Sequence, residues 1–157
     1  MQRILSFLLS AALASLAGAC TDGFAATPES GPPIKWGPAP AVFPAGAQFA
    51  VLQGDPSKDG VYTVRLKLPN GYRIAPHTHP TDENVTVIEG AFLVGMGEKF
   101  DAKALQELKA GGFVTAPANM AHYATARGAT IVQVHGVGPF ALTYVNPADM
   151  PRSTAAK

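Results

Sequence analysis

Residues 71–90 (GYRIAPHTHPTDENVTVIEG) contain two histidines one residue apart and, four residues later, a glutamate. Alternate side chains of an extended strand point to the same face, so His77 and His79 are expected to face the same way. Glu83 follows closely enough to join them. Two imidazoles and a carboxylate on one face make most of a coordination shell for a divalent transition metal. His122, further along the chain, is the candidate for the remaining ligand.

The first residues of the chain are typical of a bacterial-type secretory signal. One positive charge, Arg3, precedes an apolar run over residues 4–16, and small residues follow at 17–20. The run is too short for a comfortable transmembrane helix. We therefore expect residues 1–19 to be a signal peptide, with cleavage after Ala25 as the alternative. The protein is then expected to be exported to the periplasm or the extracellular space.

Cys20 is the only cysteine in the chain and stands where a lipoprotein signal places its lipidated residue. Two interpretations remain open. Either Cys20 is lipidated and makes the protein a membrane-anchored lipoprotein, or ordinary cleavage occurs and no lipid is attached. A lipid at Cys20 is the one membrane attachment that we expect. A single cysteine also excludes an intramolecular disulfide and any multi-cysteine metal site.

Composition and charge narrow the class of protein. A chain of 157 residues suits one domain with a substantial core. It has 12 basic and 11 acidic residues, and removing Arg3 with the signal leaves 11 of each. The sequence has no basic cluster, so no nucleic-acid binding is expected. Residues 20–45 are rich in proline, glycine and alanine and predict a tether or N-terminal arm, which leaves residues 46–150 as the folded domain.

From residue 47 onward, short apolar runs alternate with turn residues at about ten-residue spacing, which is typical of an all-β sandwich or barrel. The alternation of apolar and polar residues from Val61 to Leu68 predicts one buried face, with Tyr62, Val64, Leu66 and Leu68, and one solvated face. Gly90 predicts a tight turn between two strands, and residues 101–108 (DAKALQEL) predict one short helical insert. Strands are expected at residues 48–52, 61–68, 72–76, 83–89, 91–96, 113–116, 121–125, 130–137 and 140–145.

The order Gly71, His77, His79, Glu83 and Gly90 resembles the first conserved motif of the cupin superfamily at every position. Each spacing between these five residues is the one that the motif requires. A motif with three ligand positions is a more specific signal than an isolated His-x-His pair.

A second stretch resembles the second cupin motif, with Gly111, Pro117 and His122 in register. Asn119 stands where glycine is usual, and asparagine tolerates the positive φ that such a turn position requires. Ala126 stands where asparagine is usual, which removes a residue that is not a ligand.

The resemblance extends over residues 45–146, so residues 46–150 are interpreted as a cupin domain. It implies a double-stranded β-helix, the cupin jelly-roll barrel, with one short helical insert. It also implies one divalent metal inside the barrel, held by His77, His79, Glu83 and His122. Three imidazoles and a carboxylate suit Fe, Mn, Ni, Cu, Co or Zn better than Ca or Mg. The alternative is that these four are unrelated residues of surface loops.

Three more residues are candidates for the substrate pocket. His135 and Gln133 share a strand face, and His135 is interpreted as a substrate-binding or acid–base residue of the cavity. A core or rim histidine is the alternative. Arg73 is an even number of residues before His77, so it is expected on the same strand face and could hold an anionic substrate. An exposed arginine is the alternative.

Together these features predict an exported metal-binding cupin, namely a small metal-dependent oxygenase or oxidoreductase that acts on a small organic molecule. A non-enzymatic ligand-binding or sensor cupin is one alternative, and a cupin isomerase or decarboxylase is another. The resemblance further implies a homodimer, to which the apolar part of the arm at residues 34–43 could contribute.

Overall fold

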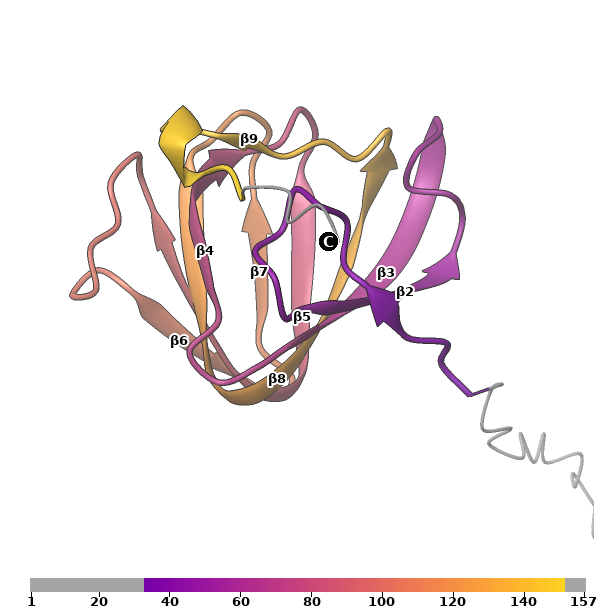
Figure 1. Cartoon of the computed structure of the whole chain (residues 1–157), viewed down its shortest axis with the longest axis horizontal. Helices are drawn as coiled ribbons and strands as arrows, with labels where there is room; N and C mark the ends of the chain where they lie inside the picture. The colour runs from indigo at the N-terminus through magenta and orange to yellow at the C-terminus, as the bar shows by residue number, and fades with distance from the viewer. Residues whose placement is uncertain (1–32, 152–157) are drawn as a thin grey trace, which may run out of the picture. The chain divides into compact units, whose positions relative to one another are not determined.

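Antiparallel strands make up nearly all the regular structure of residues 33–151, the part of the chain that the computed structural model describes (Figure 1). A single turn of 3-10 helix, η1, is the one helical element among these residues. No helix among them is long and apolar enough to cross a membrane. The elements are β1 (Gly37–Pro38), β2 (Gln48–Gln53), β3 (Gly60–Leu68), β4 (Arg73–Thr78), β5 (Glu83–Met96), β6 (Gln106–Lys109), β7 (Phe113–Ala116), β8 (His122–Gly138), β9 (Thr143–Tyr144) and η1 (Pro147–Asp149).

Two long strands, β5 and β8, organise the sheet. They pair with each other along most of their length. The later part of β8 also pairs with β3, and its first part pairs with β4. β5 pairs in addition with β6 and β7, and the remaining order is β1-β2-β3-β8-β4-β9. The sheet curls around a common interior (Figure 1), and the predicted all-β jelly-roll fold is confirmed.

The predicted face of β3 is also confirmed. Tyr62, Val64, Leu66 and Leu68 are buried, whereas the alternate residues are half-buried or exposed. The inner face packs against buried side chains of β5 and β8, among them Val85 and Val134, to form the core. This is the burial that alternation at a period of two produces.

The predicted turn at Gly90 is wrong, because β5 runs through it as one strand. Gly90 has φ +77° and lies at a register shift between Glu89 and Ala91, as in a β-bulge. A Cβ at this position would lie 2.4 Å from the carbonyl oxygen of Ala129. Positive φ is common to glycine turns and glycine bulges, so the residue alone does not distinguish them. The two strands expected at residues 121–125 and 130–137 are likewise one strand, β8.

The predicted helical insert at residues 101–108 is also wrong. Its last residues belong to β6, which pairs antiparallel with residues 91–94 of β5. Leu108 packs against the core from this strand. A helix of two turns is unstable by itself, and the edge of β5 offers hydrogen-bond partners that such a helix lacks.

The described part of the expected N-terminal arm, residues 33–45, lies against the barrel. Gly37 pairs with Phe49 of β2, and Phe43 is buried in the core. The hydroxyl of Tyr72 donates a hydrogen bond to the carbonyl oxygen of Pro44. Residues 1–32, which include the predicted signal peptide and Cys20, are outside the described residues.

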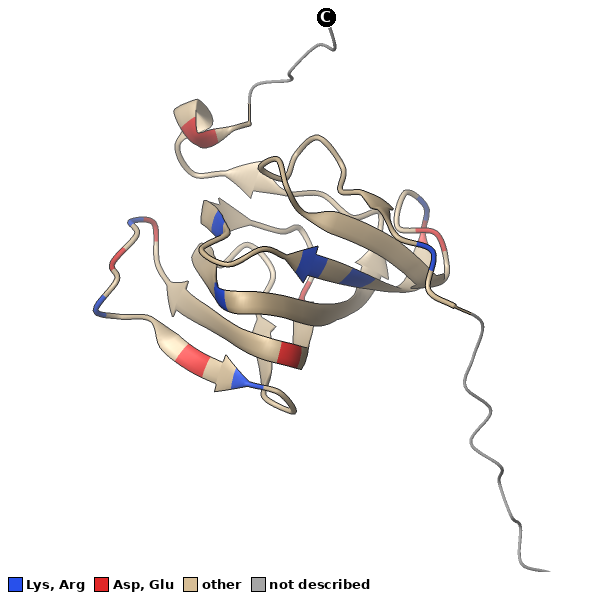
Figure 2. Cartoon of the chain, turned by 60° about the horizontal axis from the view of Figure 1, so that its bottom comes forward, with Lys and Arg blue, Asp and Glu red and all other residues tan. Residues whose placement is uncertain are grey.

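Figure 2 shows the charged residues of the barrel. Lysine and arginine positions (blue) and aspartate and glutamate positions (red) both occur along its loops and strands.

Candidate metal centre

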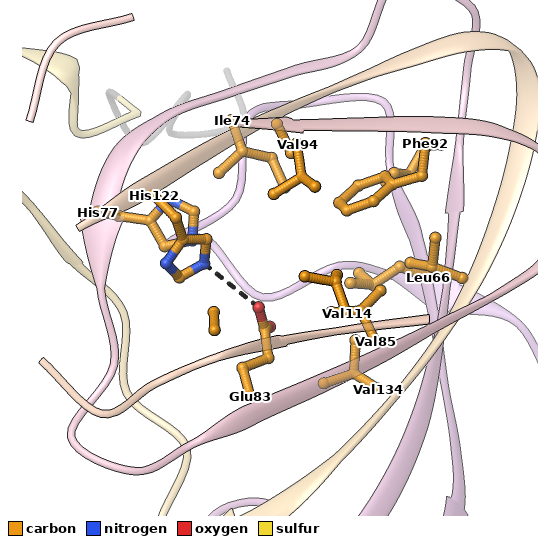
Figure 3. A pocket seen from close by; sticks show the side chains of 14 residues that line it. Leu66, Ile74, His77, Glu83, Val85, Phe92, Val94, Val114, His122 and Val134 are labelled. Carbon is orange, nitrogen blue, oxygen red and sulfur yellow. Dashed lines mark ion pairs between the residues drawn. The ribbon is translucent and has the colours of Figure 1, made fainter. Parts of the chain in front are cut away.

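The sheet brings the four predicted ligands together at one end of the barrel interior. His77 lies in β4 and pairs directly with His122, the first residue of β8. His79 follows the end of β4, and Glu83 is the first residue of β5. Each residue offers one ligand atom, which is an imidazole nitrogen or a carboxylate oxygen. These four atoms all lie within 4.8 Å of one another. Figure 3 shows His77 and His122 on the same side of the cavity as Glu83.

The backbone orients all three imidazole rings. Each Nδ1 lies within hydrogen-bond distance of a carbonyl oxygen: 2.8 Å from His77 to Ala75, 2.7 Å from His79 to Ala141 and 3.1 Å from His122 to Met120. A carbonyl oxygen can only accept, so Nδ1 carries the proton in each ring. Nε2 is therefore the atom left to bind a metal, and its direction is set before the metal arrives.

Two of the Nε2 atoms have no hydrogen-bond partner among the described residues although they are buried, those of His79 and His122. They lie 3.6 Å and 3.4 Å from a carboxylate oxygen of Glu83, longer than the roughly 2.7–2.9 Å of a charge-assisted hydrogen bond. A buried polar atom without a partner costs about 1–3 kcal/mol. Three imidazole nitrogens and one carboxylate oxygen around a common point fit a divalent transition metal, which would satisfy these atoms.

The electrostatics suit cation binding. Burial lowers the pKa of His77 to about 3, with a contribution from nearby His122, so this ring is neutral at physiological pH. Burial opposes ionisation of Glu83, but His122 and His79 outweigh it and lower the pKa of its carboxyl. Burial likewise opposes a charge on His122, but Glu83 outweighs it and raises its pKa. A metal would therefore displace any proton that His122 shares with Glu83.

The turn between β7 and β8 supports two of the ligands. The backbone N–H of Asn119 donates to the carbonyl oxygen of His79 at 2.8 Å. Asn119 has φ +61°, which confirms that asparagine here replaces a glycine in the left-handed conformation. The Asp82 carboxylate accepts a hydrogen bond from the N–H of Ala118 at 2.8 Å. Asp82 was not identified from the sequence, where its position beside Glu83 was the sole signal.

Residues 140–141, just before β9, also hold the His79 ring in place. Besides the carbonyl of Ala141, the ring of Phe140 lies 5.3 Å from the His79 ring between centroids. Phe140 also stacks on Phe43, whose ring lies 6.0 Å away. The sequence predicts a strand over residues 140–145, but the strand is limited to β9 (Thr143–Tyr144), and no sequence signal connects the preceding residues with the ligands.

The predicted cavity residues on β8 lie on the outer face of the barrel. His135 is exposed, whereas its neighbour Val134 lines the cavity. Gln133 is half-buried on the same outer face as His135, and its Oε1 accepts a hydrogen bond from Nε of Arg65 at 3.1 Å. The two residues share a face as predicted, but that face points away from the candidate ligands.

Arg73 also lies outside the cavity. It is exposed, and its guanidinium lies 3.6 Å above the centroid of the Phe100 ring, in cation–π geometry. The pairing of β4 with β8 shifts register between Ile74 and His77. Counting alternate residues back from His77 therefore places Arg73 on the wrong face of the strand. Ile74 takes the inward position instead.

A small apolar cavity of about 20 Å³ lies beside the cluster. Figure 3 shows His77, His122 and Glu83 at one end and Phe92 and Leu66 at the other. The lining residues are Leu66, Leu68, Ile74, His77, Glu83, Val85, Phe92, Val94, Val114, Ala116, His122, Ala124, Val132 and Val134.

Comparison with known proteins identifies both family and fold. The family model described as the ChrR cupin-like domain matches residues 33–141. No curated protein matches the chain in sequence.

Among solved structures, the polyketide cyclase RemF from Streptomyces resistomycificus has a TM-score of 0.62 and 14% identity, over 76% of this chain and 84% of that one. A provisionally assigned acetylacetone dioxygenase from Methylibium petroleiphilum has a TM-score of 0.57 and 24% identity, over 76% and 81%. KdgF from a Halomonas species has a TM-score of 0.51 and 23% identity, over 66% and 84%. At these identities the similarities establish the fold alone.

Proposed function

The chain belongs to the ChrR cupin-like domain family, and from this premise we propose that it is a metal-dependent oxidoreductase of the oxygenase type that acts on a small organic molecule. One observation carries the proposal. Three buried histidines, each with Nδ1 bound to a backbone carbonyl, aim Nε2 at a region that also contains the Glu83 carboxylate.

The residues of the chain would hold the metal in a defined state. His77, His79 and His122 would each bind through Nε2, and Glu83 would bind through carboxylate oxygen. A bound transition metal would supply Lewis acidity and, for a redox-active ion, electron exchange. Four protein donors leave positions free on an ion that takes six, which is what a small substrate requires.

The surroundings of the ligands keep the site dry. His77, His79 and His122 are only 3–4% exposed, and the cavity beside them has mostly aliphatic walls. Polar interactions are stronger where water is excluded, so the anionic Glu83 would neutralise part of the metal charge effectively. The similar structures that are described as a dioxygenase and a cyclase share the fold and leave the reaction open.

Metal analysis and oxygen consumption together test this proposal. The full chain, purified from its native compartment, is expected to contain about one transition-metal ion per chain. The loaded protein should consume dioxygen with at least one member of a panel of enolic, phenolic and thiol compounds. The matched variant Glu83→Gln should not. Inertness of the loaded protein across the panel would contradict oxygenase activity.

A second candidate is a non-enzymatic metal-dependent ligand-binding or sensor module. The size of the cavity favours a role that needs no organic molecule there, such as sensing through the metal itself, because about 20 Å³ leaves such a molecule little room behind the ligands. Such a module would be stabilised by its ligand without turnover, which thermal unfolding with and without each compound would measure. Turnover of any compound would exclude a pure binding role.

We also propose that the protein is exported, on the basis of residues 1–25. Intact-mass measurement of the natural protein should find its N-terminus at Cys20 or just after Ala25, with the mass of added lipid if Cys20 is modified. An uncleaved N-terminus would contradict export by this route.

We further propose a homodimer that involves the N-terminal arm. Light scattering should then give a dimer for the full chain and a monomer for a variant without residues 21–42, which removes nearly all of the apolar part at residues 34–43 and retains the buried Phe43. A monomer in both cases would remove this proposal.

A further inference from the structure

We propose that the apolar cavity behind the metal ligands is a binding site for a small apolar gas molecule, dioxygen in the reaction proposed above. The identity of the gas rests on that proposed function, whereas the site itself rests on the shape and chemistry of the cavity. No polar side chain lines this cavity other than His77, Glu83 and His122, within the part of the chain described.

The size of the cavity selects a small occupant. Its volume is about 20 Å³. A void needs roughly 10–15 Å³ on this measure to hold one water-sized molecule. By contrast, an apolar cavity that accepts benzene measures about 150 Å³. One diatomic molecule therefore fits beside the ligands, and an organic ring does not.

The chemistry of the walls favours an apolar occupant over water. A buried water needs about 2–4 polar partners, and the aliphatic and aromatic side chains of the cavity supply none. The polar atoms at its end are the Nε2 atoms and the Glu83 carboxylate, which are the atoms directed at the metal. Once they are used for coordination, water finds no partner there beyond the metal itself, whereas an apolar gas needs none.

Two alanines keep this space open next to the ligands. Ala116 pairs directly with Glu83 across β7 and β5. Ala124 lies two residues after His122 on the same inner face of β8 and pairs with Val94. Both alanines line the cavity and are 2% exposed. A larger side chain at either position would project into the space and fill it.

Xenon is a suitable probe, because it is apolar, small and visible by anomalous scattering. Crystals of the metal-loaded full chain under xenon pressure should show one xenon in the cavity, in contact with wall residues such as Val85 and Val134. An empty cavity under xenon, or ordered water in it with the metal bound, would overturn the proposal. The experiment needs no substituted protein, so it stands even if a variant fails to fold.

Ala124→Leu tests the assignment against a matched control. Ala126→Leu places the same side chain two residues further along β8, at a position that is equally buried and does not line the cavity. Ala124→Leu should lose xenon and keep the metal content of the unmodified protein, whereas Ala126→Leu should keep both. Retention of xenon in Ala124→Leu would contradict the placement. Ala124→Val, a smaller change, should weaken xenon occupancy if the leucine variant does not fold.

Kinetics separates this inference from the proposed function. If the protein is an oxygenase, Ala124→Leu should raise KM for dioxygen several-fold and leave KM for the organic substrate unchanged. Xenon occupancy without any oxygen consumption would support the gas site and contradict the oxygenase. Oxygen consumption without xenon occupancy would support the oxygenase and contradict the gas site.

Discussion

His77 and His122 lie directly opposite each other in the pairing of β4 with β8, and their ring centroids are 4.2 Å apart. Residues far apart in the chain thus become cross-strand neighbours on the inner face of one sheet. Side chains opposite each other in an antiparallel pair have Cβ atoms about 4.5–5.5 Å apart. Two Nε2 atoms can therefore converge on one ion without a flexible loop between them.

Replacing one of these two histidines should remove the metal and leave the fold. We expect His122→Ala to lose the bound metal, because the site then has two imidazoles in place of three. Elemental analysis measures the metal, and far-UV circular dichroism follows the fold. His135→Ala is the control: His135 is exposed on the outer face, so this variant should keep its metal. Unchanged metal content in His122→Ala would contradict the ligand assignment.

Asp82 is predicted to act on the metal through the turn that it holds. Asp82→Ala removes the acceptor for the N–H of Ala118 and loosens the turn bound to His79 and His122. Loss of a residue that hydrogen-bonds directly to a metal ligand weakens metal affinity by about 10–100-fold, and Asp82 acts one hydrogen bond further out, so we expect the lower end of this range, about 10-fold. Competition with a chelator measures the affinity. Asp59→Ala, at an exposed aspartate, should leave it unchanged, and equal affinities in the two variants would remove the role of Asp82.

The conformation of Asn119 predicts an unusual order of substitutions. Its φ of +61° suits glycine and asparagine and disfavours other residues, above all β-branched ones. Asn119→Gly should leave the free energy of unfolding nearly unchanged. Asn119→Val should lower it by about 1–2 kcal/mol. Urea unfolding of the metal-free proteins measures both free energies. Equal stability of the two variants would contradict the prediction, because it would mean that the backbone at residue 119 can leave the positive-φ conformation at no cost.

Buried tyrosines should make the fold sensitive to alkaline pH. Burial, with a contribution from Glu83, raises the pKa of Tyr62 to about 12, and burial raises the pKa of Tyr72 and Tyr144 as well. The unfolded chain loses these protons near pH 10, whereas the folded protein keeps them. This contribution to stability is therefore fully present below about pH 10 and is lost as the pH rises toward 12.

Urea midpoints measured from pH 8 to 12 should show this loss. Tyr72→Phe removes one titrating group and the hydrogen bond to Pro44, so it should be less stable by about 1 kcal/mol at pH 8. Its stability should then fall less steeply above pH 10 than that of the unmodified protein. A parallel fall in both proteins would contradict a role for Tyr72.

Much of the fold and of the candidate site could be predicted because the relevant signals are local. The inner face of β3 follows from alternation at a period of two, and its four predicted inward residues are buried. The spacing of His77, His79 and Glu83 predicted three metal ligands, and the structure brings these residues together. Positive φ at Asn119 followed from the chemistry of one side chain.

The errors arose where pairing between distant strands overrides a local preference. Residues 106–109 have helical composition, but the exposed edge of β5 makes them a strand. Gly90 has the positive φ of a turn glycine, yet it lies within a strand at a register shift, because β8 continues to pair with β5 on both sides of it. A register shift in β4 places Ile74 rather than Arg73 toward the interior.

The sequence by itself therefore determined the ligand types, their spacing and the strand periodicity, since these depend on neighbours within a few residues. Only the tertiary structure decided which face of β8 looks inward. Both faces carry apolar residues, Ile131 and Val137 on one and Val132 and Val134 on the other. Parity places His135 and Gln133 together but cannot choose between the two faces. The closure of the sheet around its interior makes that choice, and it places valines rather than polar side chains beside the metal ligands.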